Sequence, residues 1–152
     1  MSSYAAPLKD FRFLLDHVFL ASRLSETQRF AEATPDLVWA VIEEGARFAE
    51  QTLAPLNRSG DEQGCVFSDG RVATPAGFLQ AYQRFRDGGW AGLTAAPEHG
   101  GQGLPHTLYT LVDEMMTSAN PGFAMYRGLI DGAYRTLAKF GSPDLQEAYL
   151  PA

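Results

Sequence analysis

The chain has little cysteine, few basic residues and no long apolar run. Cys65 is the single cysteine among 152 residues, so it has no internal disulfide partner, which weakly indicates a reducing compartment. Twelve basic residues against eighteen acidic ones give a net charge of -6, which opposes binding to a nucleic-acid backbone. No run of about 18 apolar residues occurs, and Asp10, Arg12, Asp16 and His17 interrupt the beginning of the chain. The sequence therefore predicts a soluble cytoplasmic protein with no signal peptide, no membrane span and no nucleic-acid partner.

Several catalytic motifs are also missing. The glycine-rich residues 88–105 end in Gly-Leu-Pro instead of Gly-Lys-Ser/Thr, which excludes a Walker-type phosphate loop. Residues 99–103 read HGGQG, but no Gly-x-Ser-x-Gly nucleophile elbow accompanies them, so an esterase oxyanion loop is excluded. Predicted strands do not alternate with predicted helices, which excludes a Rossmann fold. The composition, 45% hydrophobic, fits one globular domain.

Apolar residues recur at helical spacing over most of the chain. Residues 34–35, 74–75 and 142–143 each pair a hydroxyl residue with proline, which predicts three helix starts, and Pro55 predicts a helix end. Residues 65–73 contain a Ser-Asp-Gly turn and could form a small hairpin. The fold class expected is all-α, with about six helices over residues 8–22, 34–54, 74–88, 108–119, 123–140 and from 143 onward.

The stretch from 123 to 140 carries two patterns. Arg127, Asp131, Arg135 and Lys139 follow one another every four residues, which predicts a charged stripe with an Asp131–Arg135 pair. The opposite side is expected to be a core face, made of Phe123, Tyr126, Ile130, Ala133, Leu137 and Phe140.

Met125, Gly128, Gly132 and Thr136 lie between these two faces. Each glycine costs a helix about 1 kcal/mol relative to alanine, so bulk is unwelcome at both positions. Two causes are open: a neighbouring helix packed close against the glycines, which spacing alone favours, or a lane for a ligand.

The polar residues elsewhere predict neither a catalytic pair nor a metal site. Asp113 and Glu114 are adjacent and project about 100° apart on a helix, so they do not share a proton readily and are expected on a solvated face or at a subunit contact. His99, His106 and Asp113 lack a recognised ligand spacing, so no metal is expected. Trp90 is expected to anchor the glycine-rich residues in the core.

Three stretches resemble the acyl-CoA dehydrogenases. Residues 89–105 read GWAGLTAAPEHGGQGLP, residues 139–151 read KFGSPDLQEAYLP, and both are similar to signatures of that family. Residues 4–14, YAAPLKDFRFL, are similar to the N-terminal segment of a long-form bacterial branch that includes methylmercaptopropionyl-CoA dehydrogenases. The three stretches follow one another in the family's order and cover essentially the whole chain.

The resemblance implies an FAD-dependent enzyme that oxidises an acyl-CoA thioester to the 2,3-enoyl-CoA. In such an enzyme a carboxylate would remove a proton from Cα, and the flavin would accept a hydride from Cβ. The partners implied are the acyl-CoA substrate, an electron-transfer acceptor, the remaining domains of the same chain and further copies in a dimer or tetramer.

The resemblance also divides the chain. Residues 1–33 are expected to form an N-terminal extension with an amphipathic helix, and residues 34–152 the family's N-terminal helical domain. The middle β domain and the C-terminal helical domain, which hold most flavin contacts and the catalytic glutamate, are missing from the sequence. No catalytic base is therefore assigned here, the cofactor-binding residues are unknown, and the chain is expected to be an inactive fragment.

The family's substrate-binding positions are found by counting back from Gly141. They fall at Ala124, Met125, Gly128 and Gly132, and small residues there imply a roomy pocket for a bulky or long acyl group. An alternative is a free-standing helical module that has kept the fold and binds another protein.

Overall fold

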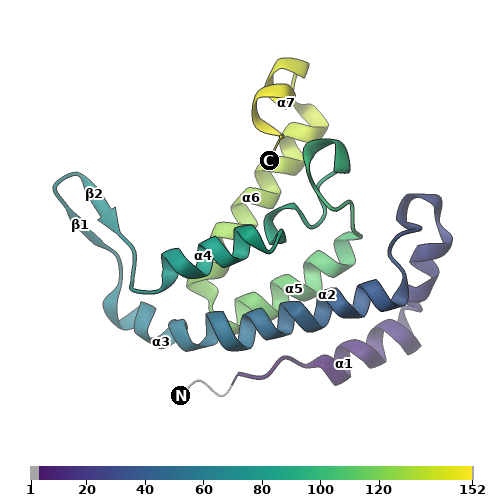
Figure 1. Ribbon diagram of the computed structural model, residues 1–152, viewed down its shortest axis with the longest axis horizontal. Coiled ribbons are helices and arrows are strands. Elements are labelled where there is room, and N and C mark those ends of the chain that lie inside the picture. Colours follow the sequence, from purple (N-terminus) through teal and green to yellow (C-terminus); the bar gives the residue numbers. More distant parts are fainter. Residues whose placement is uncertain (1–3, 152) are drawn as a thin grey trace.

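Residues 4–151 are described by the computed structural model, and they form seven α-helices and one two-stranded sheet (Figure 1). Two π-helical segments, Leu14–Val18 and Ala49–Leu53, follow α1 and α2 directly. The elements are α1 (Leu8–Phe13), α2 (Pro35–Phe48), α3 (Ala54–Gln63), β1 (Val66–Ser68), β2 (Arg71–Ala73), α4 (Phe78–Asp87), α5 (His106–Ala119), α6 (Pro121–Phe140) and α7 (Pro143–Tyr149). The all-α prediction is confirmed. No helix within residues 4–151 combines the length and the apolar character needed to cross a bilayer.

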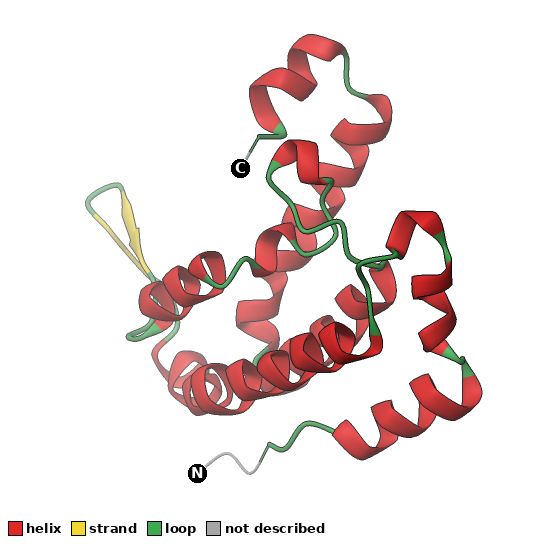
Figure 2. Ribbon diagram, turned by 45° about the vertical axis from the view of Figure 1, so that its right-hand side comes forward, coloured by secondary structure: helices red, strands yellow, loops and turns green. Residues whose placement is uncertain are grey.

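The core lies between α2, α5 and α6. Helix α2 packs along α5, and α5 packs against α6. Ile42, Val112 and Met115 have no exposed surface there. A Cβ on Gly45 would lie 3.1 Å from Met115, so this glycine lets α2 and α5 approach closely. Figures 1 and 2 show the C-terminal half of α6, with α7, standing out from this layer.

An aromatic cluster joins the core to the glycine-rich residues. Phe85 of α4 and Phe123 of α6 meet edge to face with ring centres 5.9 Å apart. Phe48 of α2 contacts both Phe123 and Trp90. Trp90 is buried, so its expected role as an anchor is confirmed.

Local caps explain where the helices begin. The hydroxyl of Thr34 accepts a hydrogen bond from Leu37 N, and that of Ser142 accepts one from Leu145 N. Both predicted hydroxyl–proline starts are therefore confirmed. The third is wrong, because α4 begins after Gly77, which has a left-handed φ of 87°, instead of at Thr74.

The predicted end of a helix at Pro55 is also wrong. The π-helical turn Ala49–Leu53 follows α2 directly, and α3 then continues to Gln63. Pro55 thereby lies directly after the π-helical turn, inside a continuous helical segment. The absence of a helical period after Pro55 was misleading, since α3 buries few residues.

The first helix is shorter than predicted. It gives way to the π-helical turn Leu14–Val18 and ends before Leu20, whose φ of 48° lies in the left-handed region. Phe11 and Leu15 are buried against the core, but Val18 and Phe19 are exposed. The 3₁₀ segments Ala21–Glu26 and Gln28–Phe30 then lead to α2.

The small hairpin is confirmed. Val66 pairs with Ala73 and Ser68 with Arg71 in an antiparallel register. Asp69 and Gly70 both have positive φ, as a two-residue turn of type I′ requires. The hairpin projects from the body of the molecule (Figure 2), and its apolar side chains are exposed.

Candidate functional site

The glycine-rich residues fold back on themselves to form a compact loop. Gln102 N donates to Gly92 O over 2.9 Å, and Gly103 N donates to Ala95 O over 2.8 Å. A Cβ on Gly101 would overlap the Ala95 carbonyl, so two strands of this loop touch where glycine alone fits. The glycines serve close backbone contact within the chain.

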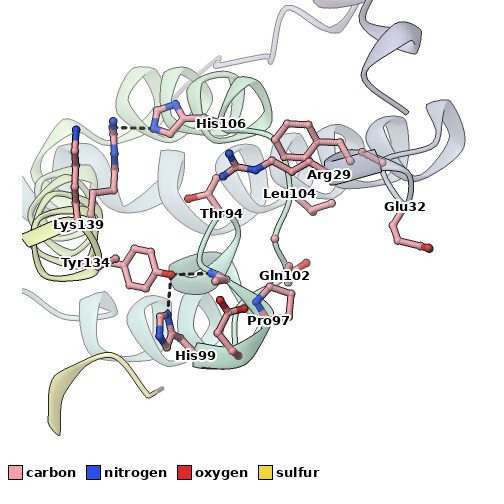
Figure 3. Close-up of a pocket in the computed structure, with 17 residues that line it drawn as sticks. Arg29, Glu32, Thr94, Pro97, His99, Gln102, Leu104, His106, Tyr134 and Lys139 are labelled. Carbon is pink, nitrogen blue, oxygen red and sulfur yellow. Dashed lines mark hydrogen bonds between the residues drawn. The ribbon is translucent and has the colours of Figure 1, made fainter. Parts of the chain in front are cut away.

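Tyr134 attaches this loop to α6 (Figure 3). Its hydroxyl accepts a hydrogen bond from Ala96 N over 2.8 Å and lies 3.1 Å from His99 Nδ1. His99 and Tyr134 also meet edge to face. The position of the loop is therefore fixed by a side chain from the C-terminal half of α6.

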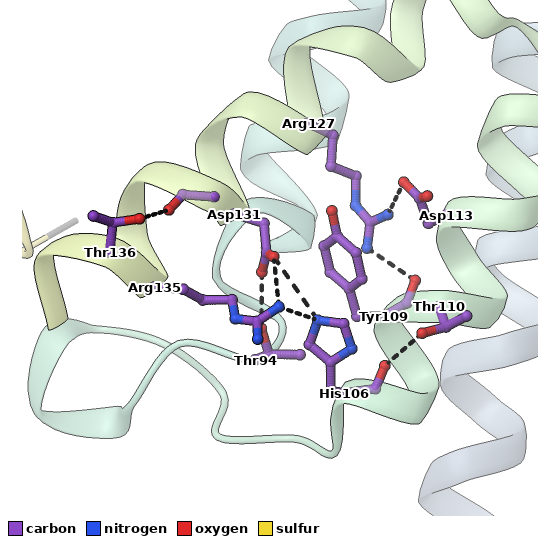
Figure 4. Close-up of polar contacts among 10 residues, drawn as sticks. Thr94, His106, Tyr109, Thr110, Asp113, Arg127, Asp131, Arg135 and Thr136 are labelled. Atoms are coloured by element: carbon purple, nitrogen blue, oxygen red, sulfur yellow. Dashed lines mark hydrogen bonds and ion pairs between the residues drawn. The ribbon is translucent and has the colours of Figure 1, made fainter. Parts of the chain in front are cut away.

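Asp131 forms a second junction (Figure 4). One carboxylate oxygen accepts a 3.5 Å hydrogen bond from the Thr94 hydroxyl. The other lies 3.8 Å from Arg135 Nη1, so the predicted Asp131–Arg135 pair is confirmed, and 3.8 Å from His106 Nε2. Arg135 Nη1 itself approaches His106 Nε2 to 3.3 Å. Three residues, one each from the loop, α5 and α6, thus surround the Asp131 carboxylate.

Arg127 is the buried member of the predicted charged stripe, with 2% of its surface exposed. Its Nη1 donates to Asp113 Oδ1 over 2.6 Å, its Nη2 donates to Tyr109 O over 3.2 Å, and the guanidinium lies 3.7 Å from the centre of the Tyr109 ring. Burial lowers the pKa of Arg127, and the charges of Tyr109 and Asp113 oppose that shift. The predicted charged stripe therefore has one buried member, Arg127, and the Asp113 side chain that pairs with it is 38% exposed.

The predicted core face of α6 is only partly buried. Phe123 is buried, but Ala133 is exposed and Phe140 is 74% exposed. The face of α6 that packs against the core instead contains Phe123 and Arg127. Spacing alone misplaced it because a buried arginine looks like a surface residue.

The open side of α6 contains three of the four predicted substrate positions. Met125 is 71% exposed, and within residues 4–151 a Cβ on Gly128 or Gly132 would meet, apart from its chain neighbours and the adjacent turns of its own helix backbone, no atom within 4 Å. A close neighbouring helix in this part of the chain therefore does not explain the two glycines. Ala124 differs, since it is buried in the core. We call Met125, Gly128, Leu129, Gly132 and Thr136 the α6 strip; all five are exposed.

An apolar groove borders the α6 strip. It lies between α4 and α6, has a volume of about 400 Å³ and is lined by Leu79, Tyr82, Tyr126, Leu129 and Ile130 among others. Leu129 belongs to both features, so the strip and the groove are continuous.

A larger and more polar cleft lies on another side of α6 (Figure 3). Its volume is about 920 Å³, and its walls come from the 3₁₀ segment with Arg29, from the glycine-rich loop and from α6. Sequence reasoning missed this cleft, because its lining residues come from two distant parts of the chain, residues 29–33 and 94–139. The structure does not bring His99, His106 and Asp113 together: they contact Tyr134, the Asp131 junction and Arg127 respectively.

Comparison with known proteins gives two findings. Residues 39–152 match the sequence profile of the acyl-CoA dehydrogenase N-terminal domain. The chain is also similar to the 3-methylmercaptopropionyl-CoA dehydrogenase of Ruegeria pomeroyi, with 35% identity over 147 residues. These residues are 97% of this chain and 25% of the relative, so the chain spans about a quarter of the relative's length.

Proposed function

The chain belongs to the acyl-CoA dehydrogenase family, and from this premise we propose that it forms the N-terminal helical part of an enzyme that oxidises an acyl-CoA thioester to the 2,3-enoyl-CoA. The α6 strip would be one wall of the acyl site. The observation that supports this most directly is the open space over Gly128 and Gly132, at two of the positions that the family resemblance marks.

The chemistry of the strip suits an acyl chain. Met125 and Leu129 offer apolar surface, and the two glycines between and beside them leave a shallow lane along the helix backbone. The hydroxyl of Thr136 is already bonded to Gly132 O over 2.8 Å, so it presents no free donor to the lane. Burying apolar groups here would contribute about 25 cal/mol per Å².

The neighbouring groove extends the space for the substrate. A linear chain lying on Leu129 could continue between α4 and α6, along Leu79 and Tyr82. We therefore propose a long or bulky acyl group in preference to a short one. Excluding water and orienting the acyl chain would be the tasks of this part of the protein.

The strip does not suit the diphosphate of FAD, because Met125, Gly128, Leu129 and Gly132 carry no charged side chain. FAD is proposed for the whole enzyme, where it supplies the redox chemistry. The catalytic base, the electron acceptor and further copies in an oligomer are likewise proposed for a protein that contains this chain. By itself the chain is proposed to be inactive.

The test is a steady-state assay of the protein encoded by the complete reading frame that contains this chain, with acyl-CoAs of increasing acyl size and an artificial electron acceptor. Gly132→Leu should raise KM for the larger acyl-CoAs about tenfold, which corresponds to about 1.4 kcal/mol, with less effect on short ones. Ala148→Leu adds comparable bulk on the exposed surface of α7 and should leave KM unchanged.

The same assay separates the alternatives. Turnover that Gly132→Leu leaves unaltered for every acyl size would remove the strip from the substrate site. A protein encoded by the complete reading frame that lacks flavin absorbance and acyl-CoA turnover would favour the protein-binding module instead.

A further inference from the structure

The polar cleft gathers positive charge in an acidic protein. The chain has a net charge of -6, yet the charged side chains that line the cleft are three cations, Arg29, Arg135 and Lys139, and two anions, Glu32 and Glu98. His99 and His106 lie on the same walls. The cleft is therefore lined by more positive than negative side chains, although the molecule as a whole is negatively charged.

Two of these cations are free. Most arginines of residues 4–151 form ion pairs with carboxylates, but Arg29 and Lys139 have no carboxylate within 4.0 Å in that part of the chain. Arg135 shares Asp131 with His106 at 3.8 Å, so its charge is only partly compensated. The charges of Arg29 and Lys139 are therefore available to an anionic ligand that enters the cleft.

The arrangement of the cleft directs these charges inward. Figure 3 shows Lys139 at one end, with Arg29 reaching into the cleft from the N-terminal segment and Glu32 at the far end from Lys139. The fixed wall between them is the loop attached by Tyr134 to α6. A volume of about 920 Å³ is enough for a nucleotide-sized ligand.

We propose that this cleft binds the diphosphate of a nucleotide, with Arg29 and Lys139 as its cationic ligands and Arg135 as a third, partly compensated one. A guanidinium from one element and an ammonium from another would hold the two phosphates, since arginine binds phosphate oxygens in a bidentate manner and lysine binds them as a point charge. Glu32 and Glu98 would lie outside the phosphate position. Their negative charge would repel a phosphate placed next to them, so the diphosphate would bind on the α6 side of the cleft.

CoA and FAD both contain an adenosine diphosphate group. The choice of these two nucleotides rests on the proposed function. The anion site itself rests on the charges and shape of the cleft. ADP is therefore the first ligand to test. Titrations with CoA and with FAD then show which of the two nucleotides the cleft binds.

The experiment is calorimetric titration of the purified protein with ADP at low salt. The double variant Arg29→Ala/Lys139→Ala should weaken ADP binding about tenfold or more, and added salt should weaken wild-type binding because the charges are near the surface. A matched control is Lys9→Ala/Arg71→Ala, which removes one lysine and one arginine that are also exposed and unpaired within residues 4–151. The control should bind ADP as the wild type does.

Two results would overturn the proposal: no saturable binding of ADP to the wild type, or equal affinity in the wild type and the double variant. Tighter binding of CoA than of ADP, lost in the double variant, would assign the site to the substrate, and the same result with FAD would assign it to the cofactor. Circular dichroism checks that both double variants are folded.

The outcome is independent of the proposed function. Turnover of acyl-CoA by a protein whose ADP binding is unaffected by the double variant would leave the enzyme proposal standing and remove this site. ADP binding that depends on Arg29 and Lys139, without any turnover, would do the reverse.

Discussion

Arg127 of α6 and Asp113 of α5 form a charged hydrogen bond of 2.6 Å that links the two helices. The two sides of this pair differ in exposure: 2% of the Arg127 side chain is accessible to solvent, but 38% of the Asp113 side chain is. The arginine therefore depends on its partner for compensation, whereas the aspartate can be hydrated.

This asymmetry gives the first prediction. Asp113→Ala leaves a buried guanidinium without its carboxylate and should lower the free energy of unfolding by about 2 to 3 kcal/mol. Arg127→Met keeps most of the buried volume and leaves an aspartate that water can reach, so its cost should be about half as large. Urea denaturation of both variants measures the difference; equal losses would contradict it.

The glycines of the α6 strip should be replaceable without harm to the fold. Gly128→Ala and Gly132→Ala add a Cβ into open space within a helix, so each should raise the free energy of unfolding by about 0.5 to 1 kcal/mol. Thermal unfolding of the chain measures this. A loss of stability in either variant would mean that another group occupies the space.

Gly101 should behave in the opposite way. Its Cβ would overlap the Ala95 carbonyl, so Gly101→Ala has to push apart two backbone strands of the loop and should destabilise the chain by about 2 kcal/mol or more. Gly122→Ala is the control, because the nearest atom to its Cβ, Asn120 Oδ1, is 3.6 Å away. Similar stabilities for the two variants would argue against the close contact.

Tyr134→Phe should loosen the glycine-rich loop. It removes the acceptor of the Ala96 amide and the partner of His99, at a cost of about 1 kcal/mol. Hydrogen exchange at the Ala96 amide should become faster, while exchange in α2 stays the same. Tyr149→Phe, at an exposed tyrosine, should change neither.

Stability should fall at alkaline pH. Burial raises the pKa of the Tyr109 phenol, and burial together with the charge of Glu50 raises that of Tyr4. A raised pKa in the folded state gives stability that is present below the ordinary value of 10.0 and is lost as the pH rises through the folded value. The free energy of unfolding of Tyr109→Phe should therefore decrease less steeply above pH 10 than that of the wild type. Parallel curves would contradict this.

Local signals predicted the local features. The caps at Thr34 and Ser142, the turn at Asp69 and Gly70, and the anchoring of Trp90 each depend on a few adjacent residues or on one large apolar side chain. The helical spacing of apolar residues predicted the all-α arrangement, which the structure confirms.

The face of α6 that enters the core was not predictable from spacing. Arg127 is buried because Tyr109 and Asp113 on α5 provide a carbonyl, a ring and a carboxylate for it, and nothing in the sequence of α6 reports those partners. The cleft with Arg29 has the same origin, since it depends on how the N-terminal segment packs. The open space over Gly128 and Gly132 is again a tertiary property, and the role of that space in substrate binding stays a prediction.

The π-helical turn Ala49–Leu53 can be described as a one-residue insertion into a continuous helix. Leu53 at its end is fully buried, and its carbonyl accepts a hydrogen bond from Asn120 Nδ2 over 3.2 Å, which ties the turn to the start of α6. Deleting one residue from this turn would restore a regular α-helix but rotate every later residue of α3 by about 100° relative to the core. Natural and engineered variants of this chain should therefore accept length changes in the β1–β2 turn far more readily than here.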